Sequence, residues 1–189
     1  MGKICWNGAA LLAPVPPVLV TCGTPEHPNI LTVGWTGICA THPPMTYISV
    51  RPTRYSYALI REQGAFAVNL PTKALVRAAD YCGVRSGAHE DKLAACGLHI
   101  ECTEQYPVPI LKEAPVSLIC QVRQVMPLGS HDMFLAEIVQ VAADEALLDE
   151  KGRLDLGKAG LIAYAHGEYF ALGEKLGSFG YSVRKKKRR

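Results

Sequence analysis

The sequence predicts a mainly β protein with short peripheral helices, folded as a closed barrel. Three observations lead to this expectation. About six β-branched or aromatic runs are bounded by Pro and Gly clusters. Helical periodicity is confined to short segments between these runs. Strands and helices do not alternate over the whole length, as they would in a doubly wound sheet, so a barrel with helices at its periphery fits better.

The first strands form an antiparallel meander. We expect strands at Val18–Gly23, Ile30–Ala40 and Met45–Arg51, because these runs are rich in β-branched and aromatic residues. A Pro/Asn turn at 25–29 separates the first two.

After Pro52 the pattern changes to a helical period. A helix is expected over Arg54–Gln63, with Thr53 as its N-cap and Gly64 as its stop, leading into a strand at Ala65–Leu70. A second helix is expected over Lys73–Cys82. It is followed by a polar, glycine-containing loop and a short helix that ends near Gly97.

The clearest hairpin lies in the second half of the chain. Strands are expected at Val116–Leu128 and His131–Asp144, joined by the tight turn Leu128-Gly129-Ser130. The alternation through the second strand predicts at least one buried face.

The 189 residues fit one domain. With 49% hydrophobic and 20% charged residues, the composition excludes a disordered or fibrous chain.

The longest apolar stretch, residues 8–23, contains three prolines and is too short to cross a bilayer, so we expect no membrane span. The start of the chain does not fit a secretory signal, and we expect a cytoplasmic protein.

The seven cysteines include no C-x-x-C pair, which argues against a zinc or thioredoxin-like site and fits free thiols in a reducing compartment. Residues 184–189 (RKKKRR) carry six of the positive charges, and without them the net charge of +3 becomes −3. We therefore expect one domain over 1–183 and a disordered basic tail over 184–189. A nucleic-acid-binding tail is the alternative, which we do not favour because the rest of the chain has no basic stripe.

The segment RPTRYSY predicts an anion site. It gathers Arg51, Thr53, Arg54 and Ser56 at a strand-to-helix junction, where guanidinium groups, hydroxyls and free helix amides can face one phosphate. The alternative is a capped helix with two solvated arginines.

Two further segments could contribute to a ligand site. In TVGWTGICATHPP, Trp35 offers an aromatic face and Thr36 a hydroxyl between two glycines, although Trp35 could instead fill the core. In ADYCGVRSGAHEDKL, Ser86, Gly87 and Lys92 lie in a polar loop that could bind an anion, but this segment taken alone favours a solvated loop with a surface lysine.

Other catalytic patterns are missing from the sequence. The six histidines form no H-E-x-x-H motif, and neither G-x-S-x-G nor G-x-G-x-x-G occurs, which disfavours zinc enzymes, hydrolases and Rossmann proteins. His131, after the tight turn, could handle a proton or be an ordinary polar loop residue. No metal ligand is assigned.

Taken in order, five motifs resemble the flavin reductase-like family of FMN-binding split barrels, and within it flavoredoxin most closely. The motifs are TVGWTGICATHPPMTYISVRPTRYSY, AVNLP, ADYCGVRSGAHEDKL, GSHDMFLAEIVQV and HGEYFALGEKLGSFGYS. Ser56 stands where these proteins often have threonine, and either hydroxyl can donate to phosphate.

The resemblance implies a homodimer with one FMN per subunit near the interface. It implies that Arg51, Arg54 and Ser56 bind the phosphate, that Trp35 and Thr36 lie along the flavin, and that Lys92 supplies positive charge. The cofactor-binding residues implied by the resemblance are Trp35, Thr36, Ser49, Arg51, Arg54, Ser56, Asn69, Ser86, Gly87, Lys92, His131 and Tyr164.

The function implied is that of an FMN-dependent oxidoreductase of the flavin reductase type. Electrons would pass from NAD(P)H or a protein donor to flavin, iron or another acceptor. A flavoredoxin-like carrier without a nicotinamide site remains an alternative. Because the flavin itself accepts hydride or single electrons, no side chain is assigned a catalytic role.

Overall fold

The structure is a computed structural model that describes residues 2–184. Residues 185–189, which make up all but the first position of the predicted basic tail, lie outside the described residues.

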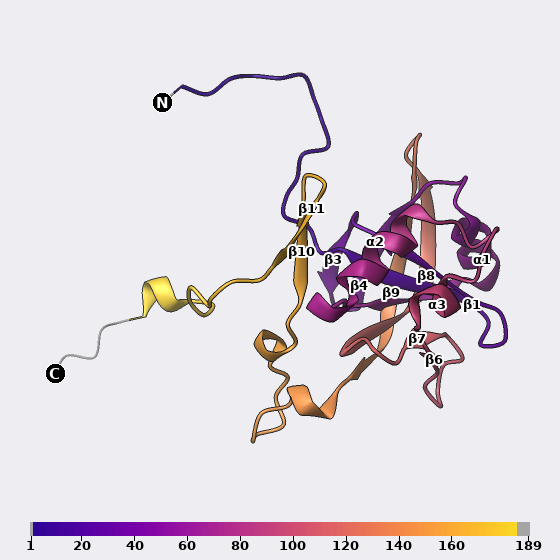
Figure 1. The fold of residues 1–189 in the computed structure, drawn as a ribbon. Helices are drawn as coiled ribbons and strands as arrows, with labels where there is room; N and C mark the ends of the chain where they lie inside the picture. The colour runs from indigo at the N-terminus through magenta and orange to yellow at the C-terminus, as the bar shows by residue number, and fades with distance from the viewer. Residues whose placement is uncertain (1, 185–189) are drawn as a thin grey trace.

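Seven antiparallel strands form one curled sheet in the order β2-β1-β5-β8-β9-β4-β3 (Figure 1). The strands are β1 (Val18–Gly23), β2 (Pro28–Val33), β3 (Thr36–Thr41), β4 (Pro44–Val50), β5 (Ala65–Asn69), β8 (Val116–Pro127) and β9 (Asp132–Ala143). The predicted mainly β fold with short helices is confirmed.

The barrel is split rather than closed. Within residues 2–184, β2 and β3 are the two ends of the sheet and do not pair with each other. The expectation of one continuous strand over Ile30–Ala40 is therefore wrong: the chain leaves β2 at Gly34 and Trp35 and enters β3 at the opposite end of the sheet. A β-branched run alone does not show where a strand changes partner.

The β8–β9 hairpin is confirmed, with Pro127 opposite Asp132 at its closed end. Gly129 in the turn has a φ of 84°, which glycine adopts without strain. Phe134 and Ala136 are fully buried, so their face of β9 is the one that packs into the barrel.

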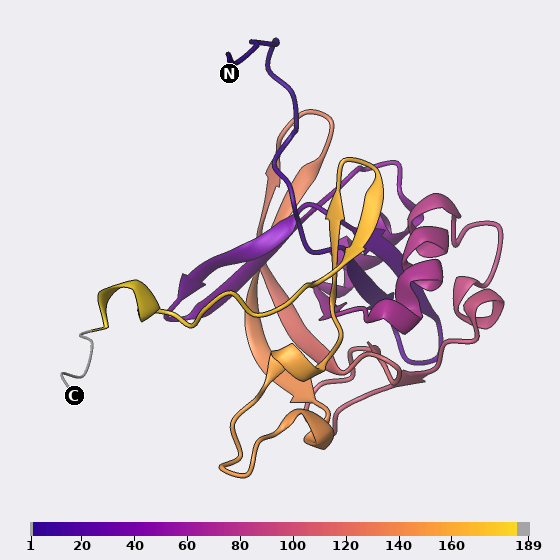
Figure 2. The same ribbon diagram turned by 60° about the vertical axis from the view of Figure 1, so that its left-hand side comes forward.

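Short helices cover one side of the barrel (Figure 2). They are α1 (Tyr55–Gln63), η1 (Lys73–Leu75), α2 (Val76–Val84) and α3 (Lys92–Cys96). Gly64 and Gly97 end α1 and α3 in the left-handed conformation, as expected. The predicted N-cap Thr53 is wrong, because Arg54 occupies that position of α1 and no side chain caps the helix.

The main core lies inside the barrel. Phe66 and Phe134 are fully buried there and pack with Val20, Ile48 and Ile60. A second apolar cluster joins Leu19 and Ile30 of the sheet to Ala79 and Cys82 of α2. Packing against the sheet thus fixes the position of α2.

Several short elements were not expected. They are β6 (Ile100–Glu101), β7 (Ile110–Leu111), η2 (Glu145–Leu147), η3 (Leu156–Lys158), β10 (Ile162–Ala165), β11 (Glu168–Ala171) and η4 (Tyr181–Val183). A two-residue turn, His166-Gly167, joins β10 to β11, and both of its residues have positive φ, as a type I′ turn requires. The hairpin is tied to the N-terminal segment by two hydrogen bonds between Val15 and Tyr164, each 2.9 Å.

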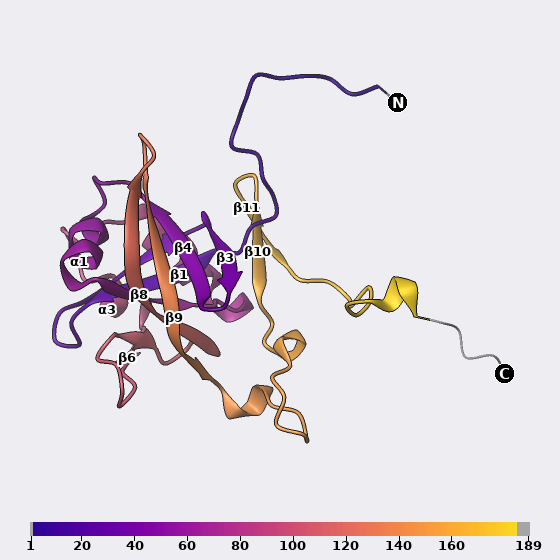
Figure 3. The same ribbon diagram turned by 180° about the vertical axis from the view of Figure 1, so that it is seen from behind.

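Both ends of the described chain leave the body on the side of β10 and β11 (Figures 1 and 3). We call residues 2–13 and 172–184 the terminal arms. They expose large apolar side chains, among them Trp6 (75% exposed), Leu176 (88%) and Phe179 (106%). Over the described range, no helix is long and apolar enough to span a membrane.

Candidate functional site

A two-lobed cleft opens at the split of the barrel. One lobe, of about 390 Å³, is lined by Trp35, His131, Tyr164 and Tyr169, and we call it the aromatic lobe. The other, of about 250 Å³, is lined by Thr53, Ser56, Arg85, Ser86, Gly87 and Lys92, and we call it the basic lobe. Arg51 and Arg54 line both lobes, so the two hollows are continuous.

The junction between β4 and α1 places the two shared arginines. Arg51 follows the last residue of β4, and its carbonyl accepts a 3.0 Å hydrogen bond from the Arg54 amide, which forms a tight turn. Among residues 2–184, neither arginine forms an ion pair. Two uncompensated guanidinium groups beside an uncapped helix N-terminus suit an anion.

Ser56 and Asn29 brace this junction from inside. Ser56 is 2% exposed, and its Oγ accepts a 2.6 Å hydrogen bond from Nδ2 of Asn29, which is itself buried. The Ser56 hydroxyl therefore keeps its own proton for another acceptor.

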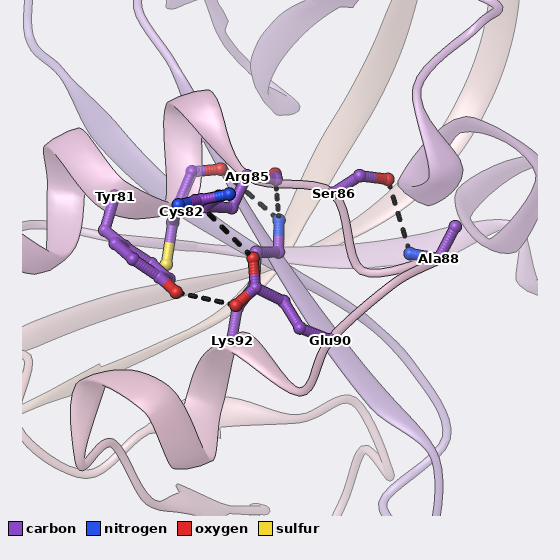
Figure 4. Close-up of polar contacts among 7 residues, drawn as sticks. All are labelled: Tyr81, Cys82, Arg85, Ser86, Ala88, Glu90 and Lys92. Atoms are coloured by element: carbon purple, nitrogen blue, oxygen red, sulfur yellow. Dashed lines mark hydrogen bonds and ion pairs between the residues drawn. The ribbon is translucent and has the colours of Figure 1, made fainter.

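The loop after α2 forms the opposite wall of the basic lobe (Figure 4). Glu90 holds this loop, since its carboxylate accepts a 2.6 Å hydrogen bond from the Tyr81 hydroxyl and lies 3.8 Å from the Arg85 guanidinium. Ser86 Oγ accepts a 3.3 Å hydrogen bond from the Ala88 amide, which tightens the turn.

Lys92 lies beneath the same loop (Figure 4). It is only 3% exposed, and its Nζ donates 3.3 Å hydrogen bonds to the carbonyls of Cys82 and Arg85, at the C-terminal end of α2. Burial lowers the pKa of Lys92, and the nearby Arg54 charge lowers it further. Lys92 thus stabilises the end of α2 while adding positive charge to the basic lobe.

Trp35 and His131 form one side of the aromatic lobe. Their ring centroids are 4.5 Å apart, with 54° between the ring planes, and Trp35 remains 47% exposed. Burial lowers the pKa of His131 below its ordinary value of 6.5, and the charges of Arg51 and Arg54 lower it further. His131 is therefore neutral near pH 7.

The β10–β11 hairpin supplies further aromatic rings. Tyr164 and Tyr169 meet edge to face, with centroids 5.2 Å apart. Burial raises the pKa of Tyr169 to about 12, and the Asp80 carboxylate on α2 adds to this shift. The Tyr169 hydroxyl therefore stays protonated and can donate a hydrogen bond within the lobe.

Ten of the predicted site residues line the cleft. Trp35, Ser49, Arg51, Arg54, His131 and Tyr164 line the aromatic lobe. Arg51, Arg54, Ser56, Ser86, Gly87 and Lys92 line the basic lobe.

The structure does not bring Thr36 or Asn69 to the cleft. The Thr36 hydroxyl donates a 2.6 Å hydrogen bond to the Tyr47 carbonyl and joins β3 to β4. Asn69 is fully buried. Its side-chain Nδ2 donates hydrogen bonds to the Leu19 carbonyl and the Thr21 hydroxyl, and its Oδ1 accepts hydrogen bonds from the Leu111 amide and the Ser117 hydroxyl. Because these hydrogen bonds use the polar atoms of Asn69, it is a structural residue of the core.

The lining residues that were not singled out from the sequence include three with polar side chains, Asp80, Arg85 and Tyr169. All three lie within motifs that carried the resemblance, in ADYCGVRSGAHEDKL and HGEYFALGEKLGSFGYS. Their positions within these motifs were the only sequence signal that could have pointed to them. Only the packing of β11 against α2 brings Tyr169 near Asp80.

Comparison with known proteins identifies the fold and the family. Residues 11–173 match the flavin reductase like domain family. The chain belongs to this family. The resemblance inferred from the five motifs is thereby confirmed. An uncharacterized protein of Archaeoglobus fulgidus is 31% identical over 145 residues, which cover 77% of this chain and 81% of that protein.

Solved structures of similar fold include two flavoredoxins. Flavoredoxin of Desulfovibrio vulgaris (Miyazaki F) is 33% identical, with a TM-score of 0.89 over 97% of this chain and 100% of that one. Flavoredoxin from Methanosarcina acetivorans is 26% identical, with a TM-score of 0.88 over the same shares. An FMN-binding protein from Thermus thermophilus is 26% identical, with a TM-score of 0.78 over 94% of this chain and 97% of that one.

Proposed function

We propose that the cleft binds FMN, with the phosphate in the basic lobe and the isoalloxazine ring in the aromatic lobe. The observation that carries this proposal is the pair of arginines shared by the two lobes, which have no carboxylate partner among residues 2–184. The family match and the similar FMN-binding protein of Thermus thermophilus support the identity of the ligand.

The residues present fit the chemistry of FMN. Arg51 and Arg54 can each donate to a phosphate oxygen, and the Ser56 hydroxyl has its proton available. Trp35 offers a half-exposed aromatic face for a planar ring. The aromatic lobe, at about 390 Å³, has the size of an ordinary small-molecule pocket.

The proposed activity is that of an FMN-dependent oxidoreductase of the flavin reductase type. Bound FMN would accept a hydride or single electrons from NAD(P)H or a protein donor and pass them to flavin, iron or another acceptor. The side chains hold and orient the ligand. The half-exposed Trp35 leaves one side of the aromatic lobe accessible to a second molecule.

The absorbance spectrum of the purified protein tests this proposal. We expect flavin bands in the visible range and release of one FMN per chain on heating. A colourless protein that also fails to bind added FMN would refute the proposal.

A flavoredoxin-like electron carrier is the second candidate, favoured by the two flavoredoxins of similar fold. The rate of NADH oxidation with and without added free FMN separates the two functions. A reductase oxidises NADH on its own, whereas a carrier needs a redox protein as donor.

We also propose that the protein acts as a homodimer, with the terminal arms packed on the partner subunit. The support is the apolar surface of the arms, since Trp6, Leu176 and Phe179 are each at least 75% exposed. Light scattering should give twice the chain mass of 20.5 kDa, and removal of residues 172–184 should weaken the dimer. A monomer at every concentration would contradict this proposal.

The cytoplasm is the proposed location, because all seven cysteines are free thiols.

We do not propose nucleic acid binding as the function of the basic tail, residues 184–189. Removing residues 184–189 should leave the FMN content unchanged, and loss of FMN would assign the tail to the fold.

A further inference from the structure

A third hollow lies directly beyond the basic lobe. It has a volume of about 240 Å³ and is lined by His27, Asn29, Leu59, Glu90 and Asp91, among others. Tyr55, Gly87 and Lys92 line both hollows. These shared residues mark the boundary between the two hollows.

The boundary is a wall made by Asn29, Tyr55 and Gly87. A Cβ atom placed on Gly87 would come within 2.1 Å of Asn29 Oδ1 and 3.0 Å of Tyr55 Cδ1. A gap that cannot hold one extra carbon atom cannot pass the chain of a larger ligand. The wall therefore ends the basic lobe, and only a displacement of the loop or of Tyr55 would open it.

Hydrogen bonds hold both sides of the wall in place. Asn29 is 7% exposed and donates to Ser56 at 2.6 Å. The Gly87 loop is held by Glu90 on one side and by the bonds of Lys92 to the end of α2 on the other (Figure 4).

The charge also changes sign across the wall. The basic lobe carries the guanidinium groups of Arg51, Arg54 and Arg85. The third hollow carries the carboxylates of Glu90, which lies 3.8 Å from the Arg85 guanidinium, and of Asp91, which caps α3. The Lys92 ammonium, which borders both, is bonded to backbone carbonyls of α2. A second phosphate beyond the wall would meet negative charge.

We propose that the wall of Asn29, Tyr55 and Gly87 selects a flavin mononucleotide over a flavin adenine dinucleotide. This inference rests on the proposed function, in which the phosphate of FMN lies in the basic lobe. In FAD the same phosphate is joined through an anhydride to a second phosphate and adenosine. That extension must either displace the wall toward Glu90 and Asp91 or turn away into solvent. In the second case the phosphate in the basic lobe has one oxygen in the anhydride bond and carries a single negative charge, so Arg51 and Arg54 bind it less strongly than the phosphate monoester of FMN. In either case FAD binds less tightly than FMN.

Equilibrium titration of the flavin-free full chain with FMN, FAD and riboflavin tests the proposal. The variants are Tyr55→Ala, which opens the wall, Glu90→Gln, which removes one charge at nearly constant shape, and the combination of both. Glu104→Gln, an exposed position outside the cleft, is the matched control for the change of charge.

We expect the wild type to bind FMN at least about tenfold more tightly than FAD. The double variant should reduce the ratio of FMN affinity to FAD affinity several-fold, and each single variant should reduce it by a smaller factor. Glu104→Gln should leave the ratio unchanged. Equal affinity of the wild type for FMN and FAD would overturn the selection and leave the proposed function standing. An undiminished preference in folded variants would show that another feature selects the cofactor. Failure of FMN to bind at all would overturn the proposed function as well.

Discussion

The two lobes of the cleft are built in different ways. The basic lobe comes mainly from two short stretches, residues 51–56 and 82–92, and its Ser56 and Lys92 are almost fully buried. The aromatic lobe draws on distant segments, including the N-terminal Pro17, the β2–β3 link and the β10–β11 hairpin, and Trp35 is half-exposed.

This difference separates two tasks. A rigid lobe with prearranged hydrogen-bond partners provides affinity, because little conformational entropy is lost when an anion binds. An open lobe with exposed rings leaves one end of the ligand accessible to a second molecule. We therefore expect changes in the basic lobe to act mainly on binding of the phosphate and changes in the aromatic lobe to act mainly on binding of the ring.

Arg51→Ala combined with Arg54→Ala should have the largest effect. Each charge-assisted hydrogen bond contributes about 1.5–3 kcal/mol, so FMN affinity should fall at least about 100-fold. Riboflavin, which lacks the phosphate, should lose much less affinity, since it keeps only the contacts that the two arginines make in the aromatic lobe. Fluorescence titration with both ligands measures this, and Arg123→Ala with Arg153→Ala, two exposed arginines, is the control. An equal loss for both ligands would place the phosphate elsewhere.

Gly87→Ala should have the next largest effect. Its Cβ would collide with Asn29 Oδ1 at 2.1 Å and force the loop or Asn29 to move. Such overpacking should lower the free energy of unfolding by about 1–3 kcal/mol, as measured by urea unfolding, and should also weaken FMN binding. Gly173→Ala, where no heavy atom lies within 4 Å, is the matched control. A stable Gly87→Ala protein with normal FMN affinity would show that the wall is loose.

Trp35→Ala should have a smaller effect that differs in kind. Removing the aromatic face should weaken FMN and riboflavin equally, by about 0.5–1.5 kcal/mol, the usual size of an aromatic stacking contribution. Fluorescence titrations with FMN and riboflavin measure this loss of affinity. A loss confined to FMN would contradict the assignment of the ring to the aromatic lobe.

The smallest expected effect is a shift in the titration of His131. Its pKa lies below 6.5 because of burial and the charges of Arg51 and Arg54. The neutral form is thus favoured in the fold, so its contribution to stability is present above pH 6.5 and is lost as the pH falls from 6.5 toward the lower folded pKa. NMR titration should show a higher pKa in Arg51→Ala, and also in the wild type with inorganic phosphate. A pKa unmoved by both would mean that the lobes are electrostatically independent.

The same contrast explains how much of the site could be predicted from sequence. Arg51, Arg54, Ser86 and Gly87 lie in short motifs at a strand-to-helix junction or in a loop, where local sequence decides the geometry. The β8–β9 hairpin was predicted for the same reason, because its turn and alternation are local signals.

Other features depend on tertiary contacts. Thr36 and Asn69 have side chains suited to a ligand, but the backbone of Tyr47 and the core polar groups bind them instead. The break between β2 and β3 depends on which strand each half pairs with. Tyr169 reaches the aromatic lobe only because the β10–β11 hairpin is bonded to Val15 and packs beside α2.

A crystal structure of the protein with FMN would test the central claim most directly. The account predicts the phosphate within hydrogen-bond distance of Arg51 and Arg54, in front of the Gly87 wall, and the isoalloxazine ring against Trp35. A ring in the basic lobe, or a phosphate exposed to solvent away from both arginines, would contradict it.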